Sequence, residues 1–325
     1  MYDVIIIGSG PAGLTAAIYT TRSSLKTLVI AGEKWGGQLM LTSLVENFPG
    51  FPEGIQGPDL MQNMRKQAEG HGAEIINVNF VKGDFSRLPS PDGEANGGQA
   101  KRPFQVSTTD RTYQAKAVII ASGADARWLG VPGEQEKIGK GVSSCATCDA
   151  PFFRNKNVII AGGGDSAMEE ALVLAKVANT VKIVHRRDAF RASQIMQERA
   201  KENPKIEFLF NSEIKEITGT DRVQGIKLFN NQTNETKELP VDGVFVAIGH
   251  IPNTKVFQGI ELDNDGYIKV QNHYHTNVPG VFTAGDVHDR SYRQAITAAG
   301  FGSAAALEAE RWLSMQGNDA DFVAN

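Results

Sequence analysis

The only two cysteines of the chain, Cys145 and Cys148, are separated by two residues and form one C-x-x-C pair. Such a pair closes a small disulfide loop, and one thiolate can attack a second disulfide while the other resolves the mixed disulfide. A structural zinc site usually takes four ligands, and the six histidines show no finger-like spacing. The pair therefore favours a redox-active dithiol over zinc, and two buried cysteines on a helix remain the alternative.

A glycine-rich turn directly follows the apolar run at residues 2–7. Its spacing is G-x-G-x-x-G, which brings a pyrophosphate close to main-chain N–H groups at a helix N-terminus. Glu33 lies 20 residues beyond the last glycine, near the end of the next strand. A carboxylate at this position accepts a hydrogen bond from a ribose hydroxyl. The turn is predicted to bind a dinucleotide through Gly8, Ser9, Gly10, Pro11, Ala12 and Gly13.

A second turn of the same kind follows residues 157–161 and reads G-x-G-x-x-A from Gly162 to Ala167. The strand after it ends without a carboxylate, in a basic cluster of His185, Arg186, Arg187 and Arg191. Guanidinium groups bind a 2′-phosphate through bidentate hydrogen bonds, whereas a carboxylate would repel it. This site therefore favours NADPH over NADH, and a solvated basic turn is the alternative interpretation.

Two dinucleotide sites in one chain suggest that one binds FAD and the other NADPH. The apolar run at 281–284 leads into Asp286. An aspartate at the carboxyl end of this strand is expected to hydrogen-bond a hydroxyl group of a flavin. Residues 121–124 and 247–250 both end apolar strands in small residues, as hinge strands that cross between domains would. Ordinary strand ends are the alternative for these segments.

The elements that must position these residues alternate between strand and helix. The strand-turn-helix unit occurs twice, 154 residues apart, which predicts an α/β fold with parallel sheets. The proline- and glycine-rich residues 89–103 are predicted to form a surface loop between two hairpin strands. Further strands are expected at 26–31, 117–121, 181–185, 243–248 and 280–284, and helices at 58–70, 165–178, 193–202 and 293–314.

The composition restricts the class of protein. A length of 325 residues favours two domains, or one domain interrupted by another, and 41% hydrophobic residues suffice for ordinary cores. The net charge of −4 gives no overall positive potential to attract nucleic acid, so no nucleic-acid partner is expected. No apolar run reaches the roughly 18–20 residues of a membrane helix, and no leader is evident, so no membrane partner and a cytoplasmic location are expected.

Further segments complete a family pattern, namely 36–39 (GGQL), 46–50 (ENFPG), 145–149 (CATCD) and 292–296 (YRQAI). With the motifs above, they resemble the low-molecular-weight thioredoxin reductases over essentially the whole chain. Ser122 stands where most relatives have threonine, a conservative change. The resemblance implies two Rossmann-like, three-layer domains and a homodimer. The FAD domain would comprise residues 1–122 and 250–325, with the NADPH domain, residues 123–249, inserted and carrying the C-x-x-C.

Carried over by motif position, the resemblance also implies site residues. FAD would be contacted by the first turn (Gly8 to Gly13), Glu33, Gln38, Asn47, Gly123, Asp286, Arg293, Gln294 and Ala295. NADPH would be contacted by Gly162, Gly164, Asp165, Ser166, His185, Arg186, Arg187 and Arg191. Cys148 would face the flavin, Cys145 would attack the protein substrate, and Asp149 would donate or accept a proton.

The implied activity is reduction of a thioredoxin-like protein by NADPH through FAD. Because the cysteines and the nicotinamide turn lie in the same inserted domain, that domain is expected to rotate about the crossovers near 122–127 and 247–251. Three alternatives remain. A ferredoxin-linked flavin reductase shares the scaffold but lacks the C-x-x-C, a redox sensor would not turn over, and a relative could use another electron donor or acceptor.

Overall fold

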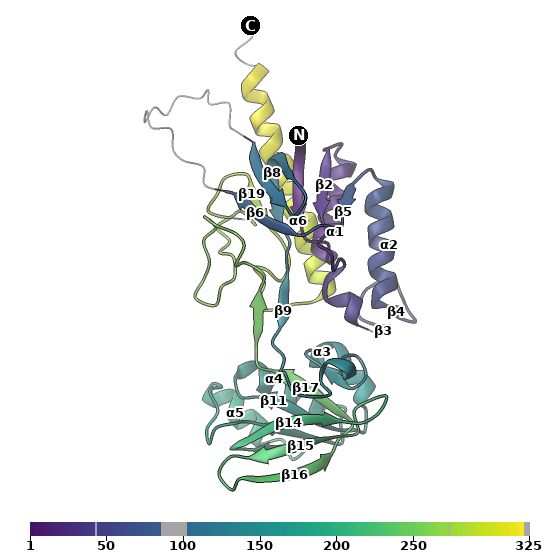
Figure 1. Cartoon of the computed structure of the whole chain (residues 1–325), viewed down its shortest axis with the longest axis vertical. Helices are drawn as coiled ribbons and strands as arrows, with labels where there is room; N and C mark the ends of the chain where they lie inside the picture. Colours follow the sequence, from purple (N-terminus) through teal and green to yellow (C-terminus); the bar gives the residue numbers. More distant parts are fainter. Residues whose placement is uncertain (43, 86–102, 273, 322–325) are drawn as a thin grey trace. The chain divides into compact units, whose positions relative to one another are not determined.

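The computed structural model describes residues 1–42, 44–85, 103–272 and 274–321 (Figure 1). The chain divides into two compact units, unit 1 of Met1–Asp125 with Pro252–Asn325, and unit 2 of Ala126–Ile251. Unit 1 is therefore assembled from both ends of the chain. The expected hairpin strands flanking 89–103 are present and pair antiparallel, whereas loop residues 89–102 lie outside the described residues.

Unit 1 is built on a mixed sheet with the strand order β5-β2-β1-β8-β7-β6, in which β19 also pairs with β8. The neighbours β2, β1, β8 and β19 run parallel, so their carboxyl ends lie at one edge of the sheet. The strands are β1 (Tyr2–Ile7), β2 (Thr27–Ile30), β5 (Glu74–Ile76), β6 (Phe80–Asp84), β7 (Phe104–Thr108), β8 (Thr112–Ile120) and β19 (Val281–Thr283). A separate small hairpin pairs β3 (Leu44–Val45) with β4 (Ile55–Gln56).

Alternating side chains of the β-branched strand β1 divide the core of unit 1 into two halves. Val4 and Ile6 lie in a core cluster that also contains apolar side chains of the helices. Ile5 and Ile7 face the phenylalanines and aliphatic residues of the other layer. The helices are α1 (Pro11–Arg22), α2 (Gly57–Gly70), α6 (Ala295–Asp321) and the short 3-10 helix η1 (Gly37–Leu41).

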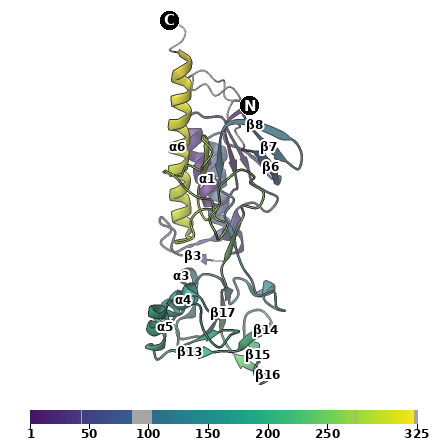
Figure 2. The same ribbon diagram turned by 90° about the vertical axis from the view of Figure 1, so that its left-hand side faces the viewer.

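Helix α6 runs alongside α1 (Figure 2). The close approach depends on Gly302, because a Cβ there would lie 2.1 Å from the carbonyl oxygen of Ala12. The helix begins at Ala295 and continues to Asp321, seven residues beyond the expected end at 314. Helix α6 therefore packs onto α1, the helix that follows the first glycine turn.

Unit 2 has three layers around a parallel sheet with the strand order β10-β17-β11-β12-β13. Ile160 and Ile183 face the helical layer, whereas Ile159 and Val184 face an antiparallel sheet, β14-β15-β16, that the sequence analysis did not anticipate. The parallel strands are β10 (Val142–Ser143), β11 (Asn157–Gly162), β12 (Thr180–Val184), β13 (Ile206–Leu209) and β17 (Gly243–Ala247). The antiparallel strands are β14 (Ser212–Thr218), β15 (Gly225–Asn230) and β16 (Glu235–Pro240).

The helices of unit 2 are short. They are α3 (Ala146–Asp149), α4 (Asp165–Ala175) and α5 (Gln194–Lys201), with 3-10 helices η2 (Gln135–Lys137) and η3 (Ala150–Phe153). Both units thus have the predicted parallel α/β architecture. In the described part of the chain, no helix combines the length and apolar character needed to cross a membrane.

Two short paired strands, β9 (Ala124–Ala126) and β18 (His250–Pro252), carry the chain between the units. Ser122 Oγ donates to the Asn253 carbonyl at 2.9 Å, and Asn253 Nδ2 donates to the Ser122 carbonyl at 3.1 Å. The predicted crossover segments therefore form one double-stranded connection.

Candidate functional site

The first glycine turn lies between the end of β1 and the start of α1. Gly8 has a φ of +115°, and a Cβ there would lie 2.1 Å from the Ala121 carbonyl oxygen of the neighbouring strand end. A Cβ on Gly13 would lie 2.0 Å from the carbonyl oxygen of Gly8. Gly10, by contrast, has open space around its missing Cβ. Two glycines allow the strand and helix to pack, and the third leaves the main chain accessible to a ligand.

Ser9 joins this turn to the loop that follows β2. Its buried hydroxyl donates to the Ala31 carbonyl and accepts from the Gly36 amide, each at 2.9 Å. The loop carries Glu33, which is exposed and whose amide donates to Asn79 Oδ1 at 3.1 Å. The predicted ribose-binding carboxylate therefore lies just beyond β2, on a loop tied to the turn.

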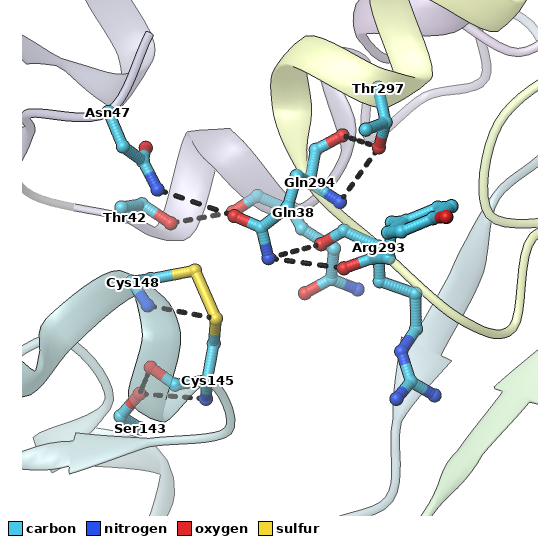
Figure 3. Close-up of a disulfide and its surroundings, with 10 residues drawn as sticks. Gln38, Thr42, Asn47, Ser143, Cys145, Cys148, Arg293, Gln294 and Thr297 are labelled. Carbon is cyan, nitrogen blue, oxygen red and sulfur yellow. Dashed lines mark hydrogen bonds between the residues drawn. A yellow bond between two sulfur atoms is a disulfide. The ribbon is translucent and has the colours of Figure 1, made fainter. Parts of the chain in front are cut away.

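Two amide side chains predicted to contact FAD bridge distant segments of unit 1. Asn47 Nδ2 donates to Gln294 Oε1 at 3.3 Å, across 247 positions of sequence (Figure 3). Gln38 Nε2 donates to Asp125 Oδ1 at 2.9 Å. These contacts bring 38–47 together with segments from the middle and the end of the chain.

Asp286 follows β19 at the same sheet edge as the first glycine turn. Its Oδ1 is buried and has no hydrogen-bond partner among the described residues. Burial raises the pKa of this carboxyl to about 7, the nearby Asp289 carboxylate adds to the rise, and Arg293 opposes it. An unpaired carboxylate oxygen at this position is suited to accept a hydrogen bond from a hydroxyl group.

Asp289 shapes the segment between Asp286 and α6. Its carboxylate accepts the backbone N–H groups of Ser291, Tyr292 and Arg293 at 2.8–3.1 Å. This turn holds Arg293 at a φ of +48° immediately before Gln294 and Ala295, the first residue of α6. Asp289 belongs to none of the predicted sites, although an aspartate often forms this kind of turn by accepting the amide two residues further on.

The second glycine turn repeats the arrangement of the first in unit 2. A Cβ on Gly162 would lie 2.6 Å from the Ala247 carbonyl oxygen, and one on Gly163 would lie 2.2 Å from His185 Nδ1. Gly164 is open, and α4 begins at Asp165 directly after it. Each turn therefore has one open glycine at the start of a helix.

Asp165 and Ser166, both predicted to contact NADPH, lie at this helix start. Asp165 Oδ1 accepts from the amide and the hydroxyl of Ser193, at 2.8 and 2.9 Å. Its carboxylate thereby ties the beginning of α4 to the segment before α5. The described geometry gives Asp165 a role in shaping the turn.

The predicted basic cluster follows β12. His185 is buried with Nδ1 3.0 Å from the Gly162 carbonyl, and burial lowers its pKa, so the ring is neutral near pH 7. Arg186, Arg187 and Arg191 are exposed, and the ion pairs described in unit 2 involve other residues. These three guanidinium groups are therefore available to an anion.

Cys145 and Cys148 form a disulfide at the start of α3, with their Cα atoms 5.3 Å apart (Figure 3). Both residues are half-buried. The Cys148 amide donates to Cys145 Sγ at 3.2 Å, and the Cys145 amide donates to Ser143 Oγ at 3.0 Å. Within the described residues, no group of three or more His, Cys, Asp or Glu side chains is arranged to hold a metal ion.

Asp149 is half-buried one residue after the disulfide. Burial raises the pKa of its carboxyl, and a hydrogen bond with Ser143 opposes the rise. A carboxyl with a raised pKa retains its proton closer to neutral pH and can exchange it with a neighbouring sulfur. The C-A-T-C-D segment thus combines a disulfide with a group suited to proton transfer.

The chain matches the family described as pyridine nucleotide-disulphide oxidoreductase over residues 2–302. It is 52% identical over 318 residues to a thioredoxin reductase of Mycolicibacterium smegmatis, covering 97% of this chain and 98% of the relative. It is also 52% identical to a thioredoxin reductase of Rickettsia bellii, covering 96% and 98%.

Two solved structures similar to the chain are also thioredoxin reductases. The thioredoxin reductase of Streptococcus pyogenes is 40% identical, with a TM-score of 0.88 over 97% of this chain and 99% of that one. The enzyme of Giardia duodenalis is 42% identical, with a TM-score of 0.87 and the same coverage. Together with the Cys145–Cys148 disulfide, these matches show that the chain belongs to the thioredoxin reductases, within the pyridine nucleotide-disulphide oxidoreductase family.

Proposed function

We propose that this chain is a thioredoxin-disulfide reductase that passes two electrons from NADPH, by way of FAD, to the Cys145–Cys148 disulfide and on to a thioredoxin-like protein. The observation that carries this proposal is the half-buried disulfide in the unit that also contains the second glycine turn and the unpaired arginines. The disulfide argues against a ferredoxin-linked reductase, which lacks the C-x-x-C pair. A redox sensor could keep the same features, and turnover with NADPH is what distinguishes it from an enzyme.

FAD is assigned to unit 1 on the fit of its residues. The open Gly10 at the start of α1 suits a pyrophosphate, and the orphaned Asp286 Oδ1 suits a flavin hydroxyl. The remaining assigned contacts are Glu33, Gln38, Asn47, Gly123, Arg293, Gln294 and Ala295. When bound, FAD accepts a hydride and delivers its two electrons to a disulfide.

NADPH is assigned to unit 2. The open Gly164 at the start of α4 is suited to the pyrophosphate, and Arg186, Arg187 and Arg191 are suited to the 2′-phosphate. Neutral His185 packs beneath the turn through its contact with Gly162. Arg187 lies 20 residues beyond Ala167, the spacing at which Glu33 follows Gly13, so a guanidinium group takes the position of the carboxylate that would favour NADH.

The disulfide chemistry follows from thiolate attack. In the reduced protein, the Cys145 thiolate attacks a sulfur of the substrate disulfide, forms a mixed disulfide, and releases one substrate thiolate, which takes a proton from Asp149. The Cys148 thiolate then attacks Cys145 Sγ, re-forms the intrachain disulfide and releases the second substrate thiolate. The Cys148 amide that donates to Cys145 Sγ stabilises negative charge on that sulfur, which supports Cys145 as the attacking residue.

Asp286→Asn is expected to stabilise the flavin-free protein at pH 8 but not at acidic pH. The carboxyl pKa is raised from 3.8 to about 7 in the folded protein. The stabilisation associated with the retained proton is therefore present below about pH 4 and is lost as the pH rises toward 7. The variant stays neutral throughout, so its unfolding free energy should exceed the wild-type value by about 4 kcal/mol at pH 8, since each pH unit between about 4 and 7 costs the wild type roughly 1.4 kcal/mol.

Thermal melts of the two flavin-free proteins between pH 5.5 and 8 test this expectation. The gap in melting temperature should shrink as the pH falls below about 7, because the folded wild-type protein then keeps its proton and ionisation of Asp286 in the unfolded chain favours unfolding progressively less. A gap that is independent of pH would contradict the assignment of a buried, ionising carboxyl to Asp286.

We also propose that unit 2 changes its orientation during turnover by bending at the β9–β18 connection. Gly249, beside β18, has a φ of +104°, and a Cβ there would meet only Arg127 Cδ, at 3.9 Å. Gly249→Ala strains this left-handed backbone and should lower kcat about three- to tenfold, with the KM for NADPH unchanged. Gly130→Ala is the control, because Gly130 also has a positive φ, of +72°, and room for a Cβ, but lies outside the connection. Stopped-flow and steady-state assays of both variants test this, and equal losses in the two would refute the hinge.

A homodimer is also proposed, and it is consistent with the exposed Leu307 and Met315 on α6. Sedimentation equilibrium of the purified protein tests it through the mass of the particle in solution.

The activity itself is tested by anaerobic titration of the purified yellow protein with NADPH, followed by addition of oxidised thioredoxin. Bleaching of the flavin absorbance, and then thiol formation in thioredoxin over many turnovers, is expected. Bleaching without turnover would leave a redox sensor, and the absence of bleaching by NADPH would point to a different electron donor.

A further inference from the structure

Three successive backbone carbonyls of the basic turn after β12 accept hydrogen bonds from outside the turn. The His185 carbonyl accepts the Ser212 amide at 2.9 Å, and the Arg187 carbonyl accepts the Asn211 amide at 3.1 Å. Between them, the Arg186 carbonyl accepts from Asn231 Nδ2 at 2.8 Å. Two of the three contacts are made by main-chain groups, so Asn231 supplies the one that depends on the type of side chain.

Asn231 is itself fixed by the neighbouring turn. It lies just after β15, and its amide donates to the Asn211 carbonyl at 2.8 Å. Asn211 has a φ of +50°, a left-handed conformation that asparagine tolerates better than most residues. The loops after β13 and β15 are therefore joined behind the basic turn.

The far end of the basic turn is anchored independently. The ring of Phe190 lies 4.6 Å from that of Phe210 and 5.4 Å from that of Phe208. The Arg191 amide donates to the Gly163 carbonyl at 2.8 Å, which joins the turn to the second glycine turn. With both ends held, the backbone of Arg186 and Arg187 is restrained at its centre by Asn231.

We propose that Asn231 is a positioning residue for recognition of the 2′-phosphate, because it fixes the backbone from which the Arg186 and Arg187 side chains extend. This inference rests on the proposed use of NADPH. An amide is well suited to the task, since it donates to a carbonyl without adding a negative charge that would compete with the phosphate for the guanidinium groups. Without the Asn231 side chain, the backbone of Arg186 and Arg187 is less restrained. More conformational entropy is then lost when the two arginines bind the phosphate, which weakens binding.

The test compares Asn231→Ala, Asn231→Gln and the control Gln232→Ala in the full-length flavin-loaded protein. Gln232 is an exposed neighbour on the same loop, and only its backbone amide takes part in the described hydrogen bonds. Calorimetry measures binding of adenosine 2′,5′-bisphosphate and of adenosine 5′-monophosphate. Steady-state assays measure KM and kcat with NADPH and with NADH.

For Asn231→Ala, affinity for the bisphosphate should fall about three- to tenfold and KM for NADPH should rise by the same factor. Affinity for the monophosphate, KM for NADH and kcat should not change. Asn231→Gln retains an amide donor and should recover part of the loss, and Gln232→Ala should behave as wild type. Equal losses with both nucleotides, or no loss with either, would overturn the positioning role.

The Arg186→Gln/Arg187→Gln background separates this inference from the proposed function. With the arginines absent, Asn231→Ala should have no further effect on bisphosphate affinity, because its contribution acts through them. If the double arginine variant itself leaves the NADPH preference unchanged, the phosphate assignment fails. If that variant loses the preference but Asn231→Ala does not weaken it, the positioning role alone fails.

Discussion

Replacing Cys148 by serine is expected to abolish thioredoxin reduction while leaving the bleaching of the flavin by NADPH intact. Nicotinamide oxidation precedes any use of the dithiol, so the first half of the reaction does not need Cys148. Cys145 alone can form a mixed disulfide with the substrate, but no second thiolate is present to release it. We therefore expect turnover to fall to background and one equivalent of mixed disulfide to accumulate when an activated thioredoxin thiol is supplied.

Anaerobic absorbance titration, coupled thioredoxin assays and mass spectrometry of the variant measure these three outcomes. Thr147→Ala is the matched control, because Thr147 lies exposed between the two cysteines without contributing sulfur. It should retain both reactions. Sustained thioredoxin reduction by the Cys148→Ser protein would show that the disulfide relay is misassigned.

The second large effect concerns the choice of nicotinamide. Arg186→Gln/Arg187→Gln should raise the KM for NADPH by roughly two orders of magnitude and leave that for NADH almost unchanged. A 2′-phosphate carries close to two negative charges, and each shielded charge-assisted contact contributes roughly 1.5–3 kcal/mol, with 1.4 kcal/mol equal to tenfold in affinity. Only NADPH has the phosphate, so only NADPH loses contacts.

Steady-state kinetics with both nucleotides, repeated at increasing salt, provide the measurement. In the unmodified protein, the preference for NADPH should decline with added salt, since these guanidinium groups are exposed and their attraction is screened. Arg199→Gln/Lys201→Gln on α5 makes the same change in net charge away from the turn and should alter neither KM. Equal use of NADH and NADPH by the unmodified protein would contradict the assignment.

The parallel architecture was predictable because its signals are local. Runs such as 2–7 and 157–161 consist largely of β-branched residues, and each is followed at once by glycines that only a tight strand-to-helix turn requires. The observed strands β1 and β11 and the helices after them begin where these signals indicate. The C-x-x-C spacing favoured a redox-active pair over zinc but left two buried helical cysteines as an alternative, and the structure has the Cys145–Cys148 disulfide.

The antiparallel sheet β14-β15-β16 could not be anticipated from the same signals. Strand β16 reads ETKELP, is largely exposed and lacks the apolar alternation of a half-buried strand. It is ordered by its pairing with β15 rather than by burial of its own side chains. Tertiary pairing of this kind leaves little trace in a single sequence.

The finer geometry of the site depends on residues distant in sequence. The isolation of Asp286 Oδ1, the contact between Asn47 and Gln294, and the use of Asp165 by Ser193 each require the folded chain. Asp286 was predicted from its place after an apolar strand, and Asn47, Gln294 and Asp165 from the family resemblance. Neither source indicated which of these side chains have protein partners. Asn231, which lies in no motif, was not nominated at all.

The assembly of unit 1 from both chain ends has a consequence for biosynthesis. The first glycine turn is translated before unit 2, whereas β19 and α6, which complete its sheet edge and pack on α1, are translated after unit 2. Unit 2 is continuous in sequence and has its own core, so it can fold while the rest is still being synthesised. The face of α1 that packs against α6 therefore stays uncovered while the whole of unit 2 is synthesised, and it is buried only after α6 has been made.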